Sequence, residues 1–287
     1  MALIQTEGLV LAVKPRSEAD LLVTLFSREL GKVQVAAKGV RKAASRRRAL
    51  AQPLIHARYL LYEGSNYLHL NQGELISAFP ELRQDLEKLL SAQYLLGLWE
   101  RVLPLRQPAP RLYRLLGAAL HLLAPLDTSL VLTYVEAQFL QVLGLRPEVN
   151  HCVQCRRPLG AGKSWWALAA GGLRGECCGP PYPGAVLLSP RLKRLLRCFF
   201  YLQPAELAAL EVSAAELEAI HQLLAEHASQ HLEDIKLQRP LIDLSAPVIL
   251  GDERGNQDGN GTVRKNGYSA AENRGDLSGG PAGPGGD

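Results

Sequence analysis

Five short apolar segments, separated by turn residues, fill the N-terminal part of this chain. They are rich in Val, Ile, Leu and Tyr and span residues 3–14, 21–27, 33–37, 54–62 and 66–77. In the fourth segment Ile55, Ala57 and Tyr59 alternate with His56 and Arg58, as side chains do in a half-buried strand. Five such strands predict a small closed β-barrel, and both the five-stranded OB-fold, which binds oligonucleotides, and an SH3-like barrel fit this pattern.

Basic residues concentrate in the connection between the third and fourth segments. No Asp or Glu occurs between Glu29 and Glu63, whereas the stretch 38–48 reads KGVRKAASRRR. A loop of one charge sign attracts polyanions, and nucleic-acid phosphate is the usual one, although a basic loop kept for solubility is the alternative. We therefore predict a DNA-binding surface that consists of Lys32, Lys38, Arg41, Lys42, Arg46, Arg47 and Arg48. Phe26, Tyr59, Tyr62 and Tyr67 are the barrel's candidates for stacking on bases, so we expect charge to contribute more than stacking.

From Pro80 onward the apolar residues recur with the helical period. Helices are predicted from Leu82 to the break at Pro104, over 111–123, from the cap candidates 127–129 to near Gly144, and over 189–202 and 213–232. Residues 251–287 are dominated by Gly, Asn, Asp and Ser and have too few apolar side chains to form a core. The sequence predicts an α+β multi-domain protein of 287 residues. Its predicted parts are an OB-fold domain (1–79), an all-α helical domain (80–150 and 186–245), a zinc-ribbon insertion (151–185) and a disordered Gly-rich tail (246–287).

Four of the five cysteines fall into two close sets within the predicted insertion. Cys152 and Cys155 form a CxxC motif, and Cys177 and Cys178 are adjacent. Four thiolates brought together by tight loops are typical of a structural Zn²⁺ site, so we predict a zinc ribbon with four cysteine ligands. The second set is CC, with Gly175 where a CxxC would have its first cysteine. Two alternatives therefore stay open: a ribbon that binds no metal, and a metal site in which His151 is a substitute ligand.

Several classes of protein do not fit the sequence. It has no apolar run long enough for a membrane span, and its N-terminus lacks the features of a signal peptide, so we expect a cytoplasmic protein. It contains no nucleophile–base motif and no paired carboxylates in an apolar setting, so we expect no enzymatic activity. Two other functions remain open: an RNA-binding module built from a zinc ribbon and an OB-fold, and a zinc-dependent nucleic-acid hydrolase, which needs an open metal position.

Segments spread along the chain carry a resemblance to a known family. They are EADLLVTLFS at 18–27, ELGK at 29–32, AKGVRK at 37–42 with SR at 45–46, ELISAF at 74–79, YLL at 94–96, and LGLRP at 143–147 leading to CVQC at 152–155. In this order they resemble the RecO family of bacterial DNA recombination and repair proteins, from residue 1 to about 240. The CC pair and the long Gly-rich tail depart from the family pattern.

The resemblance implies an N-terminal OB-fold, a helical domain and an insertion that often carries zinc. It also implies a non-enzymatic, nucleoid-associated recombination mediator that binds single- and double-stranded DNA and anneals complementary strands. With RecR, such a protein helps to load RecA onto gaps coated with single-strand-binding protein (SSB). SSB has an acidic tail that ends in apolar residues, so its receiving surface should combine an apolar groove with cations. The helix-borne candidates are Arg111, Arg114, Arg191, Lys193 and Arg194.

Overall fold

The computed structural model describes residues 3–42, 45–232 and 236–240. The predicted Gly-rich tail (246–287) lies outside these residues, as do the last five residues of the predicted helical domain. In the part of the chain that is described, no helix combines the length and the apolar character needed to cross a membrane.

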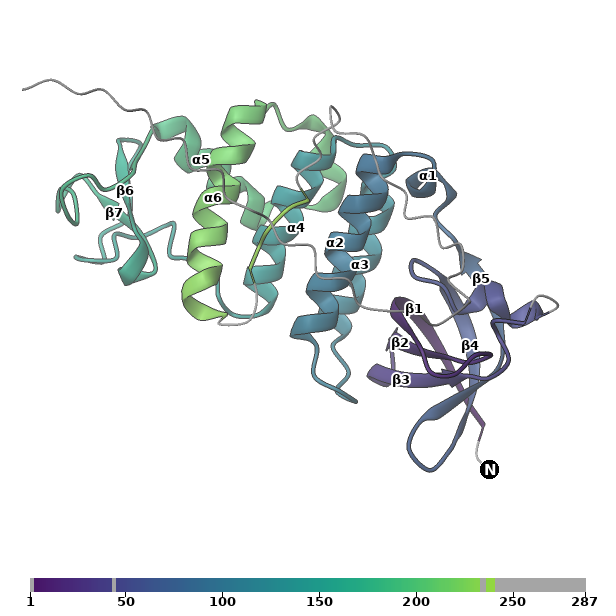
Figure 1. Cartoon of the computed structure of the whole chain (residues 1–287). Helices are drawn as coiled ribbons and strands as arrows, with labels where there is room; N and C mark the ends of the chain where they lie inside the picture. The colour runs from purple at the N-terminus through teal and green to yellow at the C-terminus, as the bar shows by residue number, and fades with distance from the viewer. Residues whose placement is uncertain (1–2, 43–44, 233–235, 241–287) are drawn as a thin grey trace, which may run out of the picture. The chain divides into compact units, whose positions relative to one another are not determined.

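Five strands form a closed barrel in the order β1-β2-β3-β5-β4 (Figure 1). Neighbouring strands pair antiparallel except β3 and β5, which pair in parallel through Val35–Leu68 and Ala36–His69. The predicted five-stranded barrel is thus confirmed. The strands are β1 (Leu3–Pro15), β2 (Leu21–Ser27), β3 (Gly31–Ala37), β4 (His56–Glu63) and β5 (Leu68–Ser77). The fourth strand begins two residues later than predicted, because Leu54 has φ +65°, a left-handed conformation that no strand continues through.

Strand β1 closes the barrel because it pairs with two neighbours at once. Its first half pairs with β4, from Leu3–Tyr62 to Leu9–His56, and its second half pairs with β2. Gly8 lies where the two pairings overlap, and a Cβ there would come within 2.9 Å of the Leu25 side chain. The inward side chains of the other strands fill the interior, as the alternation predicts. They include Val23, Leu25, Val33, Val35, Ala57, Tyr59, Leu61, Leu68 and Leu70.

The helical part begins with the short α1 (Pro80–Arg83) and continues with five longer helices. These are α2 (Leu86–Val102), α3 (Pro110–Leu122), α4 (Thr128–Val142), α5 (Pro190–Tyr201) and α6 (Ala214–His231). Side-chain caps fix the starts of four of these five helices: Asp85 accepts from Lys88 N, Asp127 from Leu130 N, Ser189 from Leu192 N and Ser213 from Glu216 N. The predicted helix positions are confirmed to within a few residues, except that the first predicted helix, which starts at Leu82, is divided into α1 and α2.

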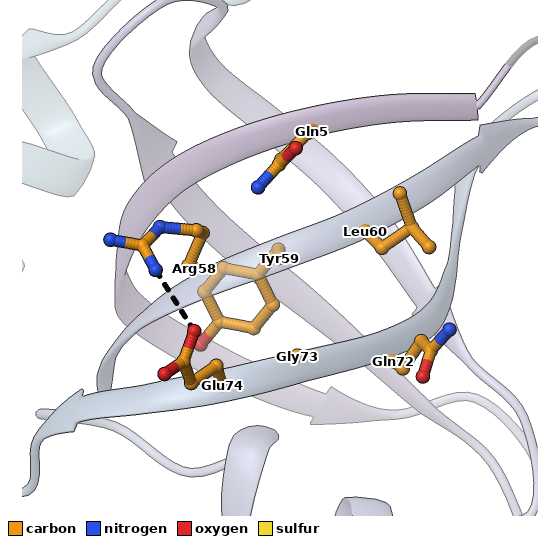
Figure 2. Close-up of a pocket in the computed structure, with 7 residues that line it drawn as sticks. All are labelled: Gln5, Arg58, Tyr59, Leu60, Gln72, Gly73 and Glu74. Atoms are coloured by element: carbon orange, nitrogen blue, oxygen red, sulfur yellow. Dashed lines mark hydrogen bonds and ion pairs between the residues drawn. The ribbon is translucent and has the colours of Figure 1, made fainter.

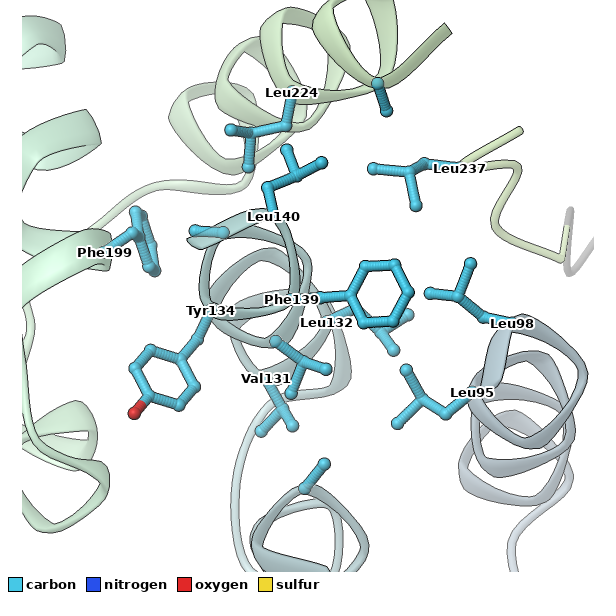
Figure 3. Packing of buried hydrophobic residues seen from close by; sticks show 14 of the residues in the cluster. Leu95, Leu98, Val131, Leu132, Tyr134, Phe139, Leu140, Phe199, Leu224 and Leu237 are labelled. Carbon is cyan, nitrogen blue, oxygen red and sulfur yellow. The ribbon is translucent and has the colours of Figure 1, made fainter. Parts of the chain in front are cut away.

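Helix α4 is the centre of the helical core (Figure 3). Phe139 packs against Trp99 of α2 with 4.7 Å between ring centroids, and Leu224 of α6 contributes to the same buried cluster. A segment beyond α6, residues 236–240, also joins this core, because Leu237 is only 3% exposed. The helices therefore share one apolar core, and residues close to the C-terminal end of the described chain help to fill it.

A buried carboxylate lies inside this core. Glu136 of α4 is fully buried and accepts hydrogen bonds from Tyr94 Oη at 3.0 Å, His221 Nδ1 at 2.9 Å and Arg239 Nη2 at 2.6 Å. Burial alone would raise the pKa of Glu136, but the bonds from His221 and Arg239 outweigh it and hold that pKa below its usual value. Glu136 thus joins α2, α6 and the 236–240 segment.

A small three-stranded sheet begins within the predicted insertion, and its last strand lies just beyond the predicted end of that insertion at residue 185. Its order is β7-β6-β8, with β6 (Ser164–Ala167), β7 (Gly172–Gly175) and β8 (Leu187–Leu188). Lys193 of α5 anchors this sheet: its ammonium donates to Gly160 O at 2.7 Å, to Gly162 O and to Ser164 Oγ at 3.3 Å. Because these acceptors lie on the turn before β6 and at its first residue, the side chain fixes the ribbon to the helices.

Candidate nucleic-acid interface and candidate metal centre

The predicted basic loop runs from the end of β3 into η1 (Arg46–Leu50), a short 3-10 helix. The loop turns at Gly39, which has φ +68° and donates its backbone N–H to Asp20 Oδ1 at 2.8 Å. Two residues further along, the backbone N–H of Arg41 donates a hydrogen bond to Ala19 O at 3.1 Å. Both acceptors belong to the turn between β1 and β2. The first part of the basic loop, residues 38–42, is therefore held to this turn by hydrogen bonds that its backbone N–H groups donate, and Asp20 is committed to one of them.

Four of the predicted DNA-binding side chains are exposed: Lys38, Arg41, Lys42 and Arg48. None of the ion pairs found among the described residues includes any of the four. The guanidinium of Arg41 does donate to Ser17 O at 3.2 Å, which orients it without neutralising its charge. Exposed cations without acidic partners keep their charge available to phosphates.

The two remaining arginines of this loop differ from those four. Arg47 is half-buried, and its guanidinium donates to Leu70 O at 3.1 Å and to Lys38 O at 3.2 Å. It thus ties η1 to β5 and to the start of the basic loop. The backbone of Arg46 lies in η1, while its side chain is outside the described part of the chain.

Lys32 lies apart from the basic loop. Its ammonium donates to Glu100 O of α2 at 2.6 Å, and its backbone carbonyl accepts from Arg106 N at 2.8 Å. Partial burial lowers the pKa of Lys32, and the Glu100 carboxylate opposes this effect. The side chain therefore connects the barrel to the helical part. The other predicted cations make no such contact with the helices among the residues described, so Lys32 has a structural role that its position in the sequence did not indicate.

A shallow hollow lies on the outer surface of β1, β4 and β5 (Figure 2). Arg58, which also belongs to the acid-free stretch, lies at this hollow, and its Nη1 is 2.9 Å from Glu74 Oε2. Gln5 and Gln72 are the other polar side chains that line it. Since Glu74 neutralises Arg58, the positive charge of the barrel is concentrated at the basic loop and not on this face.

The four aromatic candidates for stacking fall into two groups. Phe26 and Tyr59 are buried, and Tyr59 donates its hydroxyl to Leu50 O at 3.0 Å, so neither is available to a base. Tyr62 and Tyr67 are half-exposed and flank the β4–β5 turn. Two residues that sequence reasoning did not single out join them: Arg16, whose guanidinium carbon lies 5.0 Å from the Tyr67 ring centroid, and His69, whose ring stacks on Tyr62. The sequence signal that could have identified His69 is its position in the fifth predicted strand, beside Tyr67.

The four predicted metal ligands come together. The sulfur atoms of Cys152, Cys155, Cys177 and Cys178 all lie within 4.8 Å of one another. Zn–S bonds of about 2.3 Å in a tetrahedron require sulfur atoms about 3.8 Å apart, so the cluster has the size of a zinc site. The fifth cysteine, Cys198, lies on α5 and is not part of this cluster.

Hydrogen bonds already favour thiolate at the centre of the cluster. Burial would raise the pKa of Cys152, but backbone N–H groups of Cys155, Gly175 and Gln154 lower it to about 6. The pKa of Cys177 rises to about 12, chiefly because of its hydrogen bond to Cys155. A divalent cation would bind the thiolates of the cluster and displace the protons that remain on Cys177 and Cys178, whose pKa values are raised. The residues present therefore fit a four-sulfur metal site.

The structure also explains the unusual CC pair. Gly175, at the end of β7, lies directly beneath the cluster: a Cβ there would come within 2.8 Å of Leu159 and 3.3 Å of Cys177 Sγ. A cysteine at this position would have to displace the Leu159 side chain and would crowd Cys177 Sγ. A turn after β7, with Cys178 N bonded to Gly175 O at 3.0 Å, brings both adjacent cysteines to the cluster. His151, the alternative ligand, is not part of the group, and its Nδ1 lies 3.7 Å from Glu148 Oε1.

The helix-borne cations proposed for a partner protein are not equivalent. Lys193 is 2% exposed and anchors the ribbon, so its prediction as a surface contact is wrong. Arg191 pairs with Glu216, with 2.6 Å between Nε and Oε1. The remaining three, Arg111, Arg114 and Arg194, are exposed.

Comparisons with known proteins agree on one family. Residues 1–79 match the family model for the N-terminal region of recombination protein O, and residues 83–240 match the model for its C-terminal region. A protein of Bacillus pumilus is 32% identical over 230 residues, which are 80% of this chain and 89% of the relative. A protein of Heliobacterium modesticaldum is 35% identical over 230 residues, 79% of this chain and 84% of the relative. Both relatives are named DNA repair protein RecO. The chain therefore belongs to the RecO family.

Proposed function

We propose that this protein is a non-enzymatic mediator of recombination in DNA repair, which binds single- and double-stranded DNA and anneals complementary strands. The proposal rests on four exposed cations of the basic loop that form none of the ion pairs found among the described residues: Lys38, Arg41, Lys42 and Arg48. Membership of the RecO family supports it.

The loop has the properties that sequence-independent annealing needs. Two DNA strands repel each other through their phosphates, and cations that contact both strands reduce this repulsion. Lysine and arginine side chains contact phosphates without reading the base sequence, so the loop can act on any pair of complementary DNA strands. The hydrogen bonds from Gly39 N to Asp20 and from Arg41 N to Ala19 hold residues 38–42, so these residues lose less conformational entropy when DNA binds.

We propose that the cysteine cluster holds one structural Zn²⁺. Four sulfur ligands would complete the coordination of the metal and leave no open position for a water or a substrate. The metal would stabilise the ribbon, because Cys152 and Cys155 lie far in sequence from Cys177 and Cys178 and no disulfide joins these four. This arrangement supports a structural role and gives no support to hydrolysis at the metal.

The remaining assignments rest on the family. We propose that RecR, SSB and, indirectly, RecA are its partners. We also propose that the protein is cytoplasmic and associated with the nucleoid. The predicted domain boundaries stay proposals as well. Of the cations considered for the SSB tail, the exposed Arg111, Arg114 and Arg194 stay candidates.

An annealing assay tests the proposed function. Two complementary oligonucleotides, one with a fluorophore and one with a quencher, are mixed with the protein at low salt, and the rate of quenching is measured. We expect wild-type protein to accelerate annealing and the Arg41→Ala/Lys42→Ala/Arg48→Ala variant to lose most of this effect. The variant Arg111→Ala/Arg114→Ala/Arg194→Ala removes the same amount of charge from the helical surface and serves as the control. Equal loss in both variants would contradict the assignment of the interface to the basic loop.

A further inference from the structure

The β4–β5 hairpin carries a pair of stacked aromatic rings beside its turn. Tyr62 of β4 and His69 of β5 are direct cross-strand partners. Their ring centroids are 4.9 Å apart and the rings are inclined by only 13°. Gly64 allows this arrangement, since a Cβ at that position would clash with His69 Nε2. Both rings are half-exposed, so part of the stack faces solvent.

A third aromatic ring lies at the other end of the same turn. Tyr67 precedes β5, and its carbonyl accepts from Gly64 N at 3.1 Å, which closes the turn. The Arg16 guanidinium, from the turn between β1 and β2, lies over the Tyr67 ring with 5.0 Å to its centroid. Two turns that are distant in sequence therefore bring three aromatic rings and a cation together on this surface.

This aromatic group lies next to the basic loop, because His69 pairs with Ala36 near the end of β3, two residues before Lys38. The pKa of His69 is lowered, first by burial and then by the positive charges of Lys38 and Arg16. This lowering favours the neutral form of the His69 ring, which does not repel the neighbouring cations. Its Nδ1 is buried and has no hydrogen-bond partner among the described residues, so the position of the ring is not explained by hydrogen bonding through that atom.

We propose that Tyr62, Tyr67 and His69 form a stacking platform for unpaired bases, which gives the basic loop a preference for single-stranded over duplex DNA. The inference rests on the proposed function, because the cations of the loop supply the phosphate contacts. In a duplex the faces of the bases are covered by their neighbours, so only the phosphates can bind. A single strand can place bases on the aromatic rings while its phosphates reach Lys38 and Arg16.

Three fluorescent probes of equal length separate stacking from charge. They are an oligothymidine, an abasic oligodeoxyribose phosphate with the same backbone charge, and a duplex, each titrated with protein and followed by anisotropy. We expect wild-type protein to bind the oligothymidine more tightly than the abasic strand. Tyr62→Leu/Tyr67→Leu should weaken oligothymidine binding by about 5- to 150-fold per stacked base lost. The same variant should leave the affinities for the abasic strand and the duplex close to those of wild type.

Two further variants provide the controls. Tyr182→Leu removes an exposed tyrosine from the ribbon and should leave all three affinities unchanged. Tyr67→Trp keeps a stacking ring and should preserve the preference for oligothymidine, provided that its circular dichroism spectrum matches that of wild type.

Three results would overturn the inference. They are equal wild-type affinities for the oligothymidine and the abasic strand, a loss in the double variant that extends equally to the abasic strand, and a loss of the preference in folded Tyr67→Trp. Absence of binding to all three probes would refute the proposed function itself, which distinguishes that failure from a failure of the stacking platform alone.

Discussion

Removing the Arg239 side chain is expected to destabilise the helical core strongly. Arg239 lies in the segment beyond α6, and its guanidinium makes two hydrogen bonds to Glu136, at 2.6 and 3.0 Å. A third bond joins Arg239 Nη2 to Thr133 Oγ1 at 2.8 Å. The Arg239→Ala variant leaves the fully buried Glu136 carboxylate with Tyr94 and His221 as its hydrogen-bond donors.

The size of the effect follows from this geometry. Each hydrogen bond to a charged group contributes about 1.5–3 kcal/mol, and breaking a buried ion pair from one side costs about 3–5 kcal/mol. Because Tyr94 and His221 still stabilise the carboxylate, we expect a loss near the lower end of that range, about 3 kcal/mol. This is a large part of a total stability of about 5–15 kcal/mol.

Urea unfolding, followed by Trp fluorescence and by far-ultraviolet circular dichroism, measures this loss. Trp99 is fully buried and packs against Phe139, so its emission reports on the helical core. Arg58→Gln breaks an ion pair whose side chains are 49% and 74% exposed and serves as the control, with an expected cost below about 1 kcal/mol. The reasoning would be refuted if Arg239→Ala cost no more than Arg58→Gln.

Three other expectations follow from the structure and the sequence. Folding lowers the pKa of Glu136, so the stability that its carboxylate contributes is complete above the unfolded pKa of about 4.3 and is lost as the pH falls through the folded pKa. The Glu136→Gln variant should therefore lose less stability than wild type when the pH is lowered. An unchanged loss of stability at acid pH would contradict this. Metal analysis should find about one Zn²⁺ per chain. The Cys152→Ser/Cys155→Ser variant should bind no zinc, whereas the control variant Cys198→Ser should retain it. Full metal content in the double variant would exclude the site. Deletion of residues 251–287 should leave thermal unfolding and DNA annealing unchanged, because that composition offers few apolar contacts; a loss of annealing would assign the tail a role.

Local patterns were sufficient to predict much of the fold. Alternating side chains and turn residues gave the five strands of the barrel, because a period of two is incompatible with a helix. Asp127, Ser189 and Ser213 marked helix starts because their side chains satisfy backbone N–H groups within the next turn. The four cysteines were recognisable as a group because their chemistry limits what such a cluster can do.

Contacts between distant segments could not be predicted in this way. Charge patterning treated Lys32 and Lys193 as surface cations, but each donates to backbone carbonyls of another segment. A lysine with several carbonyl acceptors can be buried, and only the packed structure shows where those acceptors are. The same holds for Arg239, whose partner Glu136 is 103 residues away in sequence. The role of Gly175 was also hidden, because its lack of a side chain matters only beneath the sulfur cluster.

The salt dependence of DNA binding tests the central proposal most directly. The affinities of wild type and of Arg41→Ala/Lys42→Ala/Arg48→Ala for an oligothymidine are measured across a series of NaCl concentrations. Each phosphate contact on a single strand contributes about 0.7 to the slope of log affinity against log salt, so losing three contacts should reduce the slope by about 2. A folded variant with the wild-type slope and affinity would contradict the assignment of phosphate binding to the basic loop.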